Sequence, residues 1–204
     1  MDNNLISAVL PIPKIEPDSW DEWWKLWNEN SNPIAKIKGN HNSPAGLNKW
    51  VGFDLYRTSN YKEDNDPYKS NYIDCTDKFP VMFSMLKNIP INISHIRAIS
   101  STQQFTAHKD HNKPATSLRV MLFDNNPRDT FYYMLSNRKL KFQKFPENSN
   151  TWIYQDHLTE HGTHFILNHF KIILQIWGEW DFQKLKSLVE SSDKNYSVFE
   201  VDTP

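Results

Sequence analysis

The spacing of apolar residues changes character twice along this chain. Four tryptophans within 19–30 recur at helical intervals, and a second helical pattern covers 76–90. From residue 91 the apolar residues instead form short runs, rich in β-branched and aromatic side chains and separated by turn-forming segments such as 124–129. Helical spacing returns over 179–193. The pattern predicts a core of β-strands flanked by helices.

The predicted strands are short and follow one another closely. One covers 48–59, and the others are expected at 91–100, 105–110, 117–124, 130–136, 139–145, 150–157 and 171–178. Many short strands without long helices between them favour an antiparallel sandwich or barrel. A length of 204 residues suits one domain. We expect a single domain over 1–204, with an N-terminal arm and supporting helices in 1–90, the β-core in 91–178, and a C-terminal helix and tail in 179–204.

Polar residues mark where the two N-terminal helices are expected to begin. Asp18 or Ser19 can accept hydrogen bonds at the start of the first helix, and Thr76 or Asp77 at the start of the second. Pro90 is expected to end the second helix, because the residue before a proline is biased away from helical geometry.

Composition and charge narrow the class of protein. Hydrophobic residues make up 38% and charged residues 23%, a globular composition, and 8 Trp with 12 Phe predict an aromatic core. The net charge of −1 predicts no general attraction to nucleic acid or to anionic membranes. The single cysteine, Cys75, allows neither an intramolecular disulfide nor a CxxC zinc site, which favours a reducing compartment. Without a secretory signal pattern or a long apolar run, we expect a cytoplasmic protein.

The segment FTAHKDH, residues 105–111, carries the first chemical signal. His108 and Asp110 lie two residues apart at the end of a predicted strand, so they share one face of it. Such a pair can bind a metal, act as a catalytic dyad, or be an ordinary polar pair at the surface. His111 is interpreted as a loop residue beside this pair.

A remote histidine favours the metal interpretation. The segment WIYQDHLTEHGTHF holds His157, His161 and His164. Two ligands close in sequence and one distant histidine form the 2-His-1-carboxylate triad of non-haem Fe(II) sites. His161 is preferred because Gly162 follows it and allows close approach of the backbone. His157 has the same strand parity and remains the nearest rival, whereas His164 and His169 fit less well.

Cations within apolar strands provide a second signal. Lys171 opens the strand KIILQIWG, Arg119 lies within LRVMLF, and Arg97 lies within HIRAIS. A buried cation has to reach solvent or meet an anion. If Lys171 and Arg119 point into the β-core, a dicarboxylate bound beside the metal would supply that anion, and Arg97 is a further candidate for the same space.

Together these residues resemble the Fe(II)/2-oxoglutarate-dependent oxygenases. That superfamily has an HxD…H iron triad and a basic residue about ten positions after the distal histidine, which here reads His108, Asp110, His161 and Lys171. The likeness covers roughly 91–178. Within the superfamily the segments FTAHKDHNKPATSLRVML and WIYQDHLTEHGTHF are most similar to the aspartyl/asparaginyl β-hydroxylase branch.

The resemblance implies a double-stranded β-helix, the jelly-roll or cupin-like core, and a hydroxylase. It implies Fe(II) on His108, Asp110 and His161, with 2-oxoglutarate and O2 as co-substrates. The distal carboxylate of 2-oxoglutarate would pair with Lys171, helped by Arg119. An unactivated C–H bond would be hydroxylated, with release of succinate and CO2.

Two other classes of protein remain open. One is a cupin-like metal protein without redox chemistry, and the other is a β-sandwich binding module in which the His/Asp pairs are incidental. We expect a small-molecule or peptide substrate and neither nucleic acid nor a membrane as partner. Composition indicates neither the substrate nor the oligomeric state.

Overall fold

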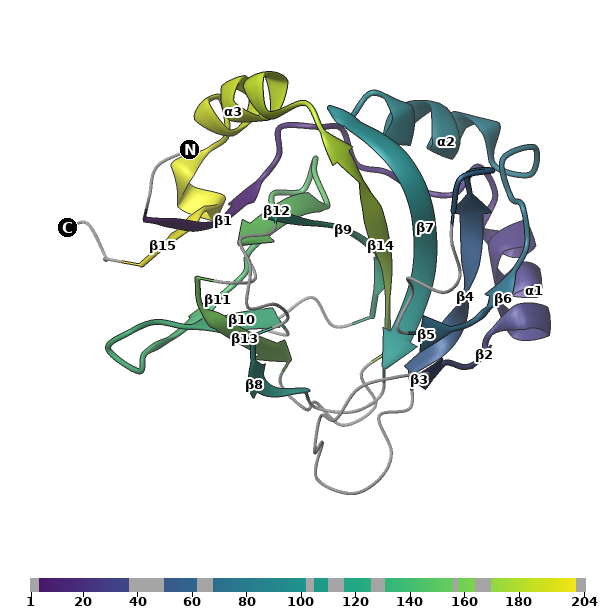
Figure 1. Cartoon of the computed structure of the whole chain (residues 1–204), viewed down its shortest axis with the longest axis horizontal. Helices are drawn as coiled ribbons and strands as arrows, with labels where there is room; N and C mark the ends of the chain where they lie inside the picture. The colour runs from purple at the N-terminus through teal and green to yellow at the C-terminus, as the bar shows by residue number, and fades with distance from the viewer. Residues whose placement is uncertain are drawn as a thin grey trace.

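The computed structural model describes residues 4–36, 50–61, 68–101, 105–109, 116–125, 131–155, 158–163 and 170–200. Strands dominate this part of the chain, and the helices lie around them (Figure 1). No helix within these ranges is long and apolar enough to span a membrane.

The α-helices of the described ranges are α1 (Trp20–Asn30), α2 (Pro80–Lys87) and α3 (Phe182–Glu190). The strands are β1 (Leu5–Val9), β2 (Asn32–Pro33), β3 (Ala35–Lys36), β4 (Trp50–Arg57), β5 (Tyr68–Lys69), β6 (Asn71–Tyr72), β7 (Ile91–Ser101), β8 (Phe105–His108), β9 (Thr116–Asp124), β10 (Phe131–Met134), β11 (Leu140–Phe142), β12 (Thr151–Gln155), β13 (Glu160–Thr163), β14 (Lys171–Trp180) and β15 (Val198–Phe199).

Two facing sheets form the core. The large sheet has the central order β12-β9-β14-β7, extended by β1 and β15 on one side and by β4, β2 and β6 on the other. The small sheet has the order β11-β10-β13-β8. The eight strands β7–β14 are divided equally between the sheets, and every pairing within these two groups of four is antiparallel. This is a jelly roll, so the predicted mainly-β fold with flanking helices is confirmed.

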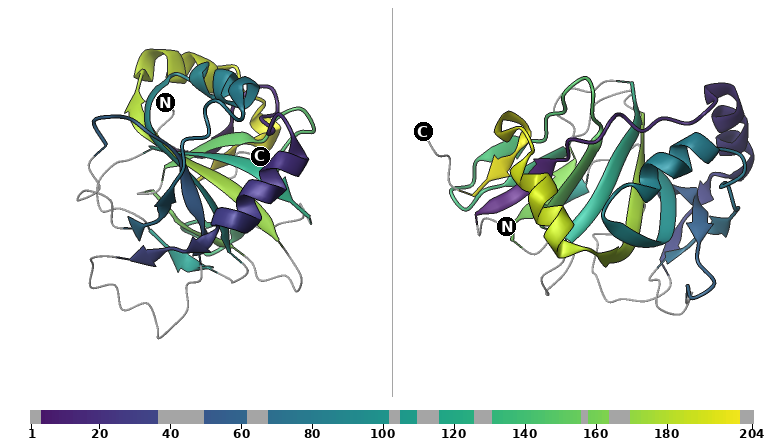
Figure 2. Two further views of the ribbon diagram at one scale, coloured as in Figure 1. Left: turned by 90° about the vertical axis from the view of Figure 1, so that its right-hand side faces the viewer. Right: turned by 90° about the horizontal axis from the view of Figure 1, so that it is seen from above.

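The two faces of the large sheet contact different partners. On β14, Ile172, Leu174 and Ile176 belong to the outer core, which also contains buried side chains of all three helices. Ile173 points to the other side and belongs to the inner core, together with Phe131 of the small sheet. Alternate residues of a strand point to opposite faces, so the inner face of β14 carries Lys171, Ile173, Gln175 and Trp177. Figure 2 shows the helices outside the large sheet.

Tryptophans attach α1 to the outer face. Ser19 accepts a hydrogen bond from the backbone N–H of Glu22 (3.3 Å) and caps the helix, as one of the two predicted caps. Trp23 is fully buried, and its ring centroid lies 6.3 Å from that of Phe53 on β4 and 5.7 Å from that of Phe79. The helical spacing of these tryptophans therefore reflects packing on the sheet.

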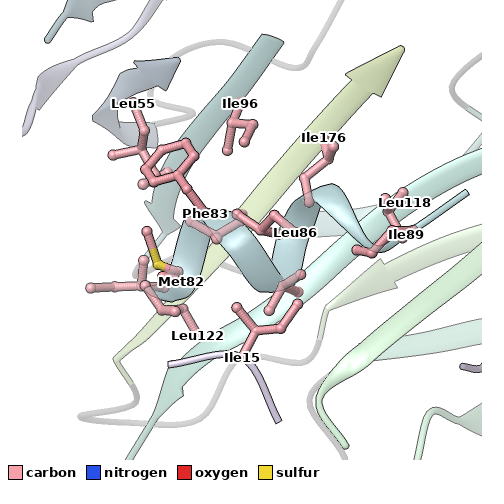
Figure 3. Packing of buried hydrophobic residues seen from close by; sticks show 14 of the residues in the cluster. Ile15, Leu55, Met82, Phe83, Leu86, Ile89, Ile96, Leu118, Leu122 and Ile176 are labelled. Carbon is pink, nitrogen blue, oxygen red and sulfur yellow. The ribbon is translucent and has the colours of Figure 1, made fainter. Parts of the chain in front are cut away.

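Helix α2 begins later than predicted, and its cap comes from far away in the chain. Thr76 lies in a turn, and the helix starts at Pro80. The carboxylate of Asp18 accepts hydrogen bonds from the backbone N–H groups of Val81 (2.9 Å) and Met82 (3.0 Å). The prediction of Thr76 or Asp77 was wrong because it considered only local caps. Figure 3 shows the helix packing Met82 and its apolar neighbours into the outer core.

The C-terminal helix is also shorter than predicted. The helical spacing over 179–193 predicted a helix from residue 179, but β14 continues to Trp180. Asp181 then accepts a hydrogen bond from the backbone N–H of Lys184 (3.2 Å) and caps α3. Near this end of β14, a Cβ atom on Gly178 would lie 2.2 Å from the carbonyl oxygen of Asn92, so only glycine fits beside β7.

Candidate functional site

Two of the predicted metal ligands are neighbours on the small sheet. His108 ends β8, and His161 is the second residue of β13. The two residues are paired across the strands, which places their side chains on the same face of the sheet. Their ring centroids are 4.8 Å apart. Residues separated by 53 positions in the sequence are thus brought side by side by the sheet register.

Aromatic rings surround His161 and hold it in place. The residue is 4% exposed, whereas His108 is exposed. The imidazole of His161 stacks on Phe131 with a centroid distance of 5.7 Å and an interplanar angle of 19°. It also contacts Tyr154 of the large sheet at 4.9 Å between centroids. His161 therefore has a fixed orientation, and one side of the pair is open to solvent at His108.

The third predicted ligand, Asp110, lies outside the described residues, as do the alternative candidates His157 and His164, the loop residue His111, and His169. Within the described residues no three potential ligands from His, Cys, Asp and Glu gather at one point. Two adjacent imidazoles nevertheless suit a divalent transition metal. The donor chemistry of His108 and His161 therefore fits the predicted Fe(II) site, with Asp110 two residues after His108.

Arg119 lies close to this histidine pair. It is 8% exposed and sits on the inner face of β9. Its guanidinium carbon lies 5.4 Å from the ring centroid of Tyr154, the same ring that contacts His161. Its Nη1 donates to the carbonyl oxygen of Leu118 (3.0 Å), and no carboxylate in the described ranges pairs with it. A buried guanidinium with this environment is suited to an anionic ligand.

Lys171 is buried at the start of β14. It is 3% exposed, it opens β14, and it is registered against Asp124 of β9. Burial lowers the pKa of Lys171 to about 8, although the charge of Asp124 partly opposes this. Arg119 is instead registered against Gln175, which lies four residues after Lys171 on β14, or about 13 Å further along the strand. Of the two predicted anchors, Arg119 is the one that shares an aromatic contact with His161.

A buried carboxylate binds the cationic side chains on the β7 side of β14, opposite Arg119. Asp54 of β4 is fully buried, and its Oδ1 accepts from Nε of Arg97 at 2.6 Å. Its Oδ2 accepts from Nε of Arg57 at 2.8 Å and lies 3.0 Å from Nε2 of His95. Burial by itself would raise the pKa of Asp54, but the hydrogen bonds and charges of His95 and Arg97 outweigh it and hold the pKa well below its usual range.

Trp177 connects this cluster to Arg119. Its ring stacks on that of His95, with a centroid distance of 4.6 Å and an interplanar angle of 12°. The guanidinium carbons of Arg97 and Arg119 lie 5.5 Å and 5.9 Å from the Trp177 ring centroid. Both arginines therefore lean toward one indole, at distances at which cation–π attraction is effective.

Sequence reasoning missed two members of this cluster. Arg97 was a candidate for the inner space, and the structure places it there fully buried, but neither Asp54 nor His95 was selected. A signal was available: Asp54 stands between Phe53 and Leu55 in a strand-like run, as Arg97 does between Ile96 and Ala98. Opposite charges at inward positions of two apolar strands indicate a buried ion pair.

Comparisons with known proteins add little to this geometry. No family model matches the chain, and no curated protein matches it. Among solved structures, the chain is similar to an oxidoreductase of the 2OG-Fe(II) oxygenase family from Burkholderia pseudomallei, with a TM-score of 0.38 and 10% sequence identity over 63% of this chain and 67% of that one. None of these comparisons supports the narrower likeness to the aspartyl/asparaginyl branch. The case for a function rests on the residues and their arrangement.

Proposed function

We propose that this protein is an Fe(II)- and 2-oxoglutarate-dependent dioxygenase that hydroxylates an unactivated C–H bond of a small-molecule or peptide substrate. The observation that carries the proposal is the pairing of His108 with His161 on the inner face of a jelly roll, one aromatic ring away from the buried guanidinium of Arg119. A metal ligand pair and a site for an anion are the two parts that such an enzyme requires.

His108, His161 and Asp110 would hold the metal. Two imidazoles and one carboxylate on one side of Fe(II) leave three coordination positions for co-substrate and O2. When bound, Fe(II) with 2-oxoglutarate and O2 supplies the oxidising power, and succinate and CO2 are released. The aromatic contacts of His161 with Phe131 and Tyr154 keep its ring oriented before any ligand binds.

Arg119 is proposed as the main anchor for the distal carboxylate of 2-oxoglutarate. Its planar guanidinium can donate two parallel hydrogen bonds to a carboxylate, which a lysine ammonium cannot do. The aromatic rings of Tyr154 and Trp177 shield it from water and thereby strengthen its interaction with an anion. Lys171, four residues before the level of Arg119 on β14, is proposed as a secondary influence on the charge of the inner face.

Two alternatives make different predictions about ligands. A cupin-like metal protein without redox chemistry would bind a metal through the same histidines but not 2-oxoglutarate, and a binding module would require neither ligand. The cytoplasm is proposed as the location because the one cysteine, Cys75, is a buried free thiol.

Anaerobic titration calorimetry with Fe(II) and then 2-oxoglutarate tests the proposal. The wild type is expected to bind both with 1:1 stoichiometry. His161→Ala is expected to abolish metal binding, whereas Lys109→Ala, a change at the exposed neighbour of His108, is the matched control and should leave it intact. Arg119→Met should weaken 2-oxoglutarate binding by about 10- to 100-fold, the value of a charge-assisted hydrogen bond, and Lys171→Met should have a smaller effect.

Succinate release then tests catalysis across a library of amino acids and peptides. Stoichiometric Fe(II) binding without any affinity for 2-oxoglutarate would favour the cupin-like alternative. The absence of both ligands, with His108→Ala and His161→Ala indistinguishable from wild type, would exclude the oxygenase.

A further inference from the structure

Gln175, near the proposed site, is one of several buried polar side chains with an atom that has no hydrogen-bond partner in the part of the chain that the structure describes. Gln175 lies on the inner face of β14 and is 6% exposed. Its Oε1 is buried, and no donor within the described ranges hydrogen-bonds to it. Buried acceptors are nearly always satisfied, so an exception beside a proposed active site points to a ligand.

The strand register places Gln175 between two arginine residues. It is paired with Arg97 on β7 and with Arg119 on β9, and side chains paired in this way share one face of the sheet. Both guanidinium carbons lie within 6 Å of the Trp177 ring, one strand repeat further along β14. The arginines thus lean toward Trp177, while Gln175 lies on the same inner face, on the strand between them.

The proposed co-substrate cannot satisfy this acceptor. At neutral pH, 2-oxoglutarate carries two carboxylates and a ketone, all of which accept hydrogen bonds and none of which donates one. Arg119, by contrast, has donors for a carboxylate. Gln175 therefore requires a different molecule, one that brings an N–H or O–H group to the same level of the inner face.

The charge around Gln175 restricts that donor further. An ammonium group brought to this level would be repelled by the guanidinium of Arg119, which is buried and pairs with no carboxylate in the described ranges, whereas the charge of Arg97 is balanced by Asp54. A neutral donor avoids this repulsion. Carboxamide N–H and alcohol O–H groups meet both requirements.

We propose that Gln175 is a substrate-binding residue, whose side-chain carbonyl oxygen accepts a hydrogen bond from a neutral carboxamide or hydroxyl group of the primary substrate. This inference rests on the proposed oxygenase function and names the substrate class for that site. The substrate is a polar molecule or peptide side chain with such a donor, and not a hydrocarbon or a lipid chain.

Binding to the full chain loaded with Zn(II) and 2-oxoglutarate tests the inference without turnover. The probes are small primary carboxamides, each paired with the methyl ketone of the same skeleton, which has the same shape but no donor. Dissociation constants come from ligand-observed NMR. The wild type should prefer the carboxamides, and Gln175→Met, which keeps the length but removes the acceptor, should reduce that preference by about tenfold. Ile173→Val, a change on the same face of the same strand, is the control and should keep it.

Thermal unfolding of the ligand-free protein adds a second measurement. Removing an unsatisfied buried acceptor should leave the melting temperature of Gln175→Met equal to or above that of the wild type. A lower melting temperature would mean that Gln175 has a structural partner and would overturn the inference.

The outcomes separate this inference from the proposed function. If the wild type binds 2-oxoglutarate but shows no carboxamide preference, or if Gln175→Met keeps that preference, Gln175 is not the substrate-binding residue and the oxygenase proposal stands. If the wild type does not bind 2-oxoglutarate at all, the oxygenase proposal itself fails.

Discussion

Neutralising Asp54 should strongly destabilise the protein. Asp54→Asn keeps the shape of the side chain but removes the negative charge that Arg97 and Arg57 contact at 2.6 and 2.8 Å. Arg97 is fully buried, so its guanidinium would remain in the core without the carboxylate it contacts through Nε. Breaking a buried pair by removing one partner typically costs about 3–5 kcal/mol. Since the side chain of Arg57 is 14% exposed and water can partly solvate it, we expect about 3 kcal/mol.

Urea denaturation at pH 7 measures this loss as a lower free energy of unfolding. The matched control is Asp74→Asn, at an exposed carboxylate whose hydrogen bonds are made locally to Thr76, and it should lose less than about 1 kcal/mol. A loss for Asp54→Asn no larger than that of the control would refute the view that Asp54 holds the cations of the inner face.

The pH dependence gives a second check on the same charge. The pKa of Asp54 is lowered in the folded protein, so its stabilisation is fully present above the ordinary carboxyl pKa of 3.8 and is lost as the pH falls through the folded value. The difference in stability between wild type and Asp54→Asn should therefore be constant from pH 5 to 7 and narrow below about pH 4. A difference that stayed constant down to pH 3 would point to packing rather than charge.

Three further changes test the fold and the inner face. Because burial lowers the pKa of Lys171 to about 8 from an ordinary 10.5, the folded state binds fewer protons than the unfolded state between these values. Wild-type stability should rise with pH across that window by up to about 3 kcal/mol, and Lys171→Met should lack this slope in thermal melts; equal slopes would contradict the burial of its ammonium group. Asp18→Ala removes two hydrogen bonds at the start of α2 and should lower the free energy of unfolding by about 1–2 kcal/mol in urea, as a lost helix cap does, whereas no change would show that the cap is dispensable. Gly178→Ala would place a Cβ 2.2 Å from the carbonyl oxygen of Asn92, so β14 and β7 must separate; a loss of about 2 kcal/mol or more is expected by the same assay, and wild-type stability would contradict the close approach.

Local patterns predicted many of the elements because periodicity is a property of neighbouring residues, but strands β1 and β13 were not among those expected. The tryptophans of 19–30 form α1 because their spacing builds an apolar stripe, and the apolar runs after residue 91 form strands because they are short and β-branched. Local reasoning was wrong at the starts of α2 and α3. Asp18 caps a helix more than 60 residues away, and no local signal contains that contact.

The candidate site was only partly accessible from the sequence. His108 and His161 were selected by residue type and spacing, and the structure places them side by side. The spacing of ten residues between His161 and Lys171 did not show where the Lys171 side chain lies relative to the histidines. The number of residues in a connection does not determine where the next strand begins in space. The strand register determines that position, and it pairs Arg119 with Gln175 rather than with Lys171.

The sequence by itself determined the class of fold and the chemical types available to it: a mainly-β domain with aromatic helices, two histidine patches and cations in apolar strands. These follow from composition and from interactions between residues near each other in the chain. Only the tertiary structure decided which side chains meet. The pairing of His108 with His161 and the ion pair of Asp54 with Arg97 arise from contacts between different strands. The placement of the Gln175 acceptor, which no donor in the described ranges reaches, depends likewise on strand register, which is set by the packing of both sheets.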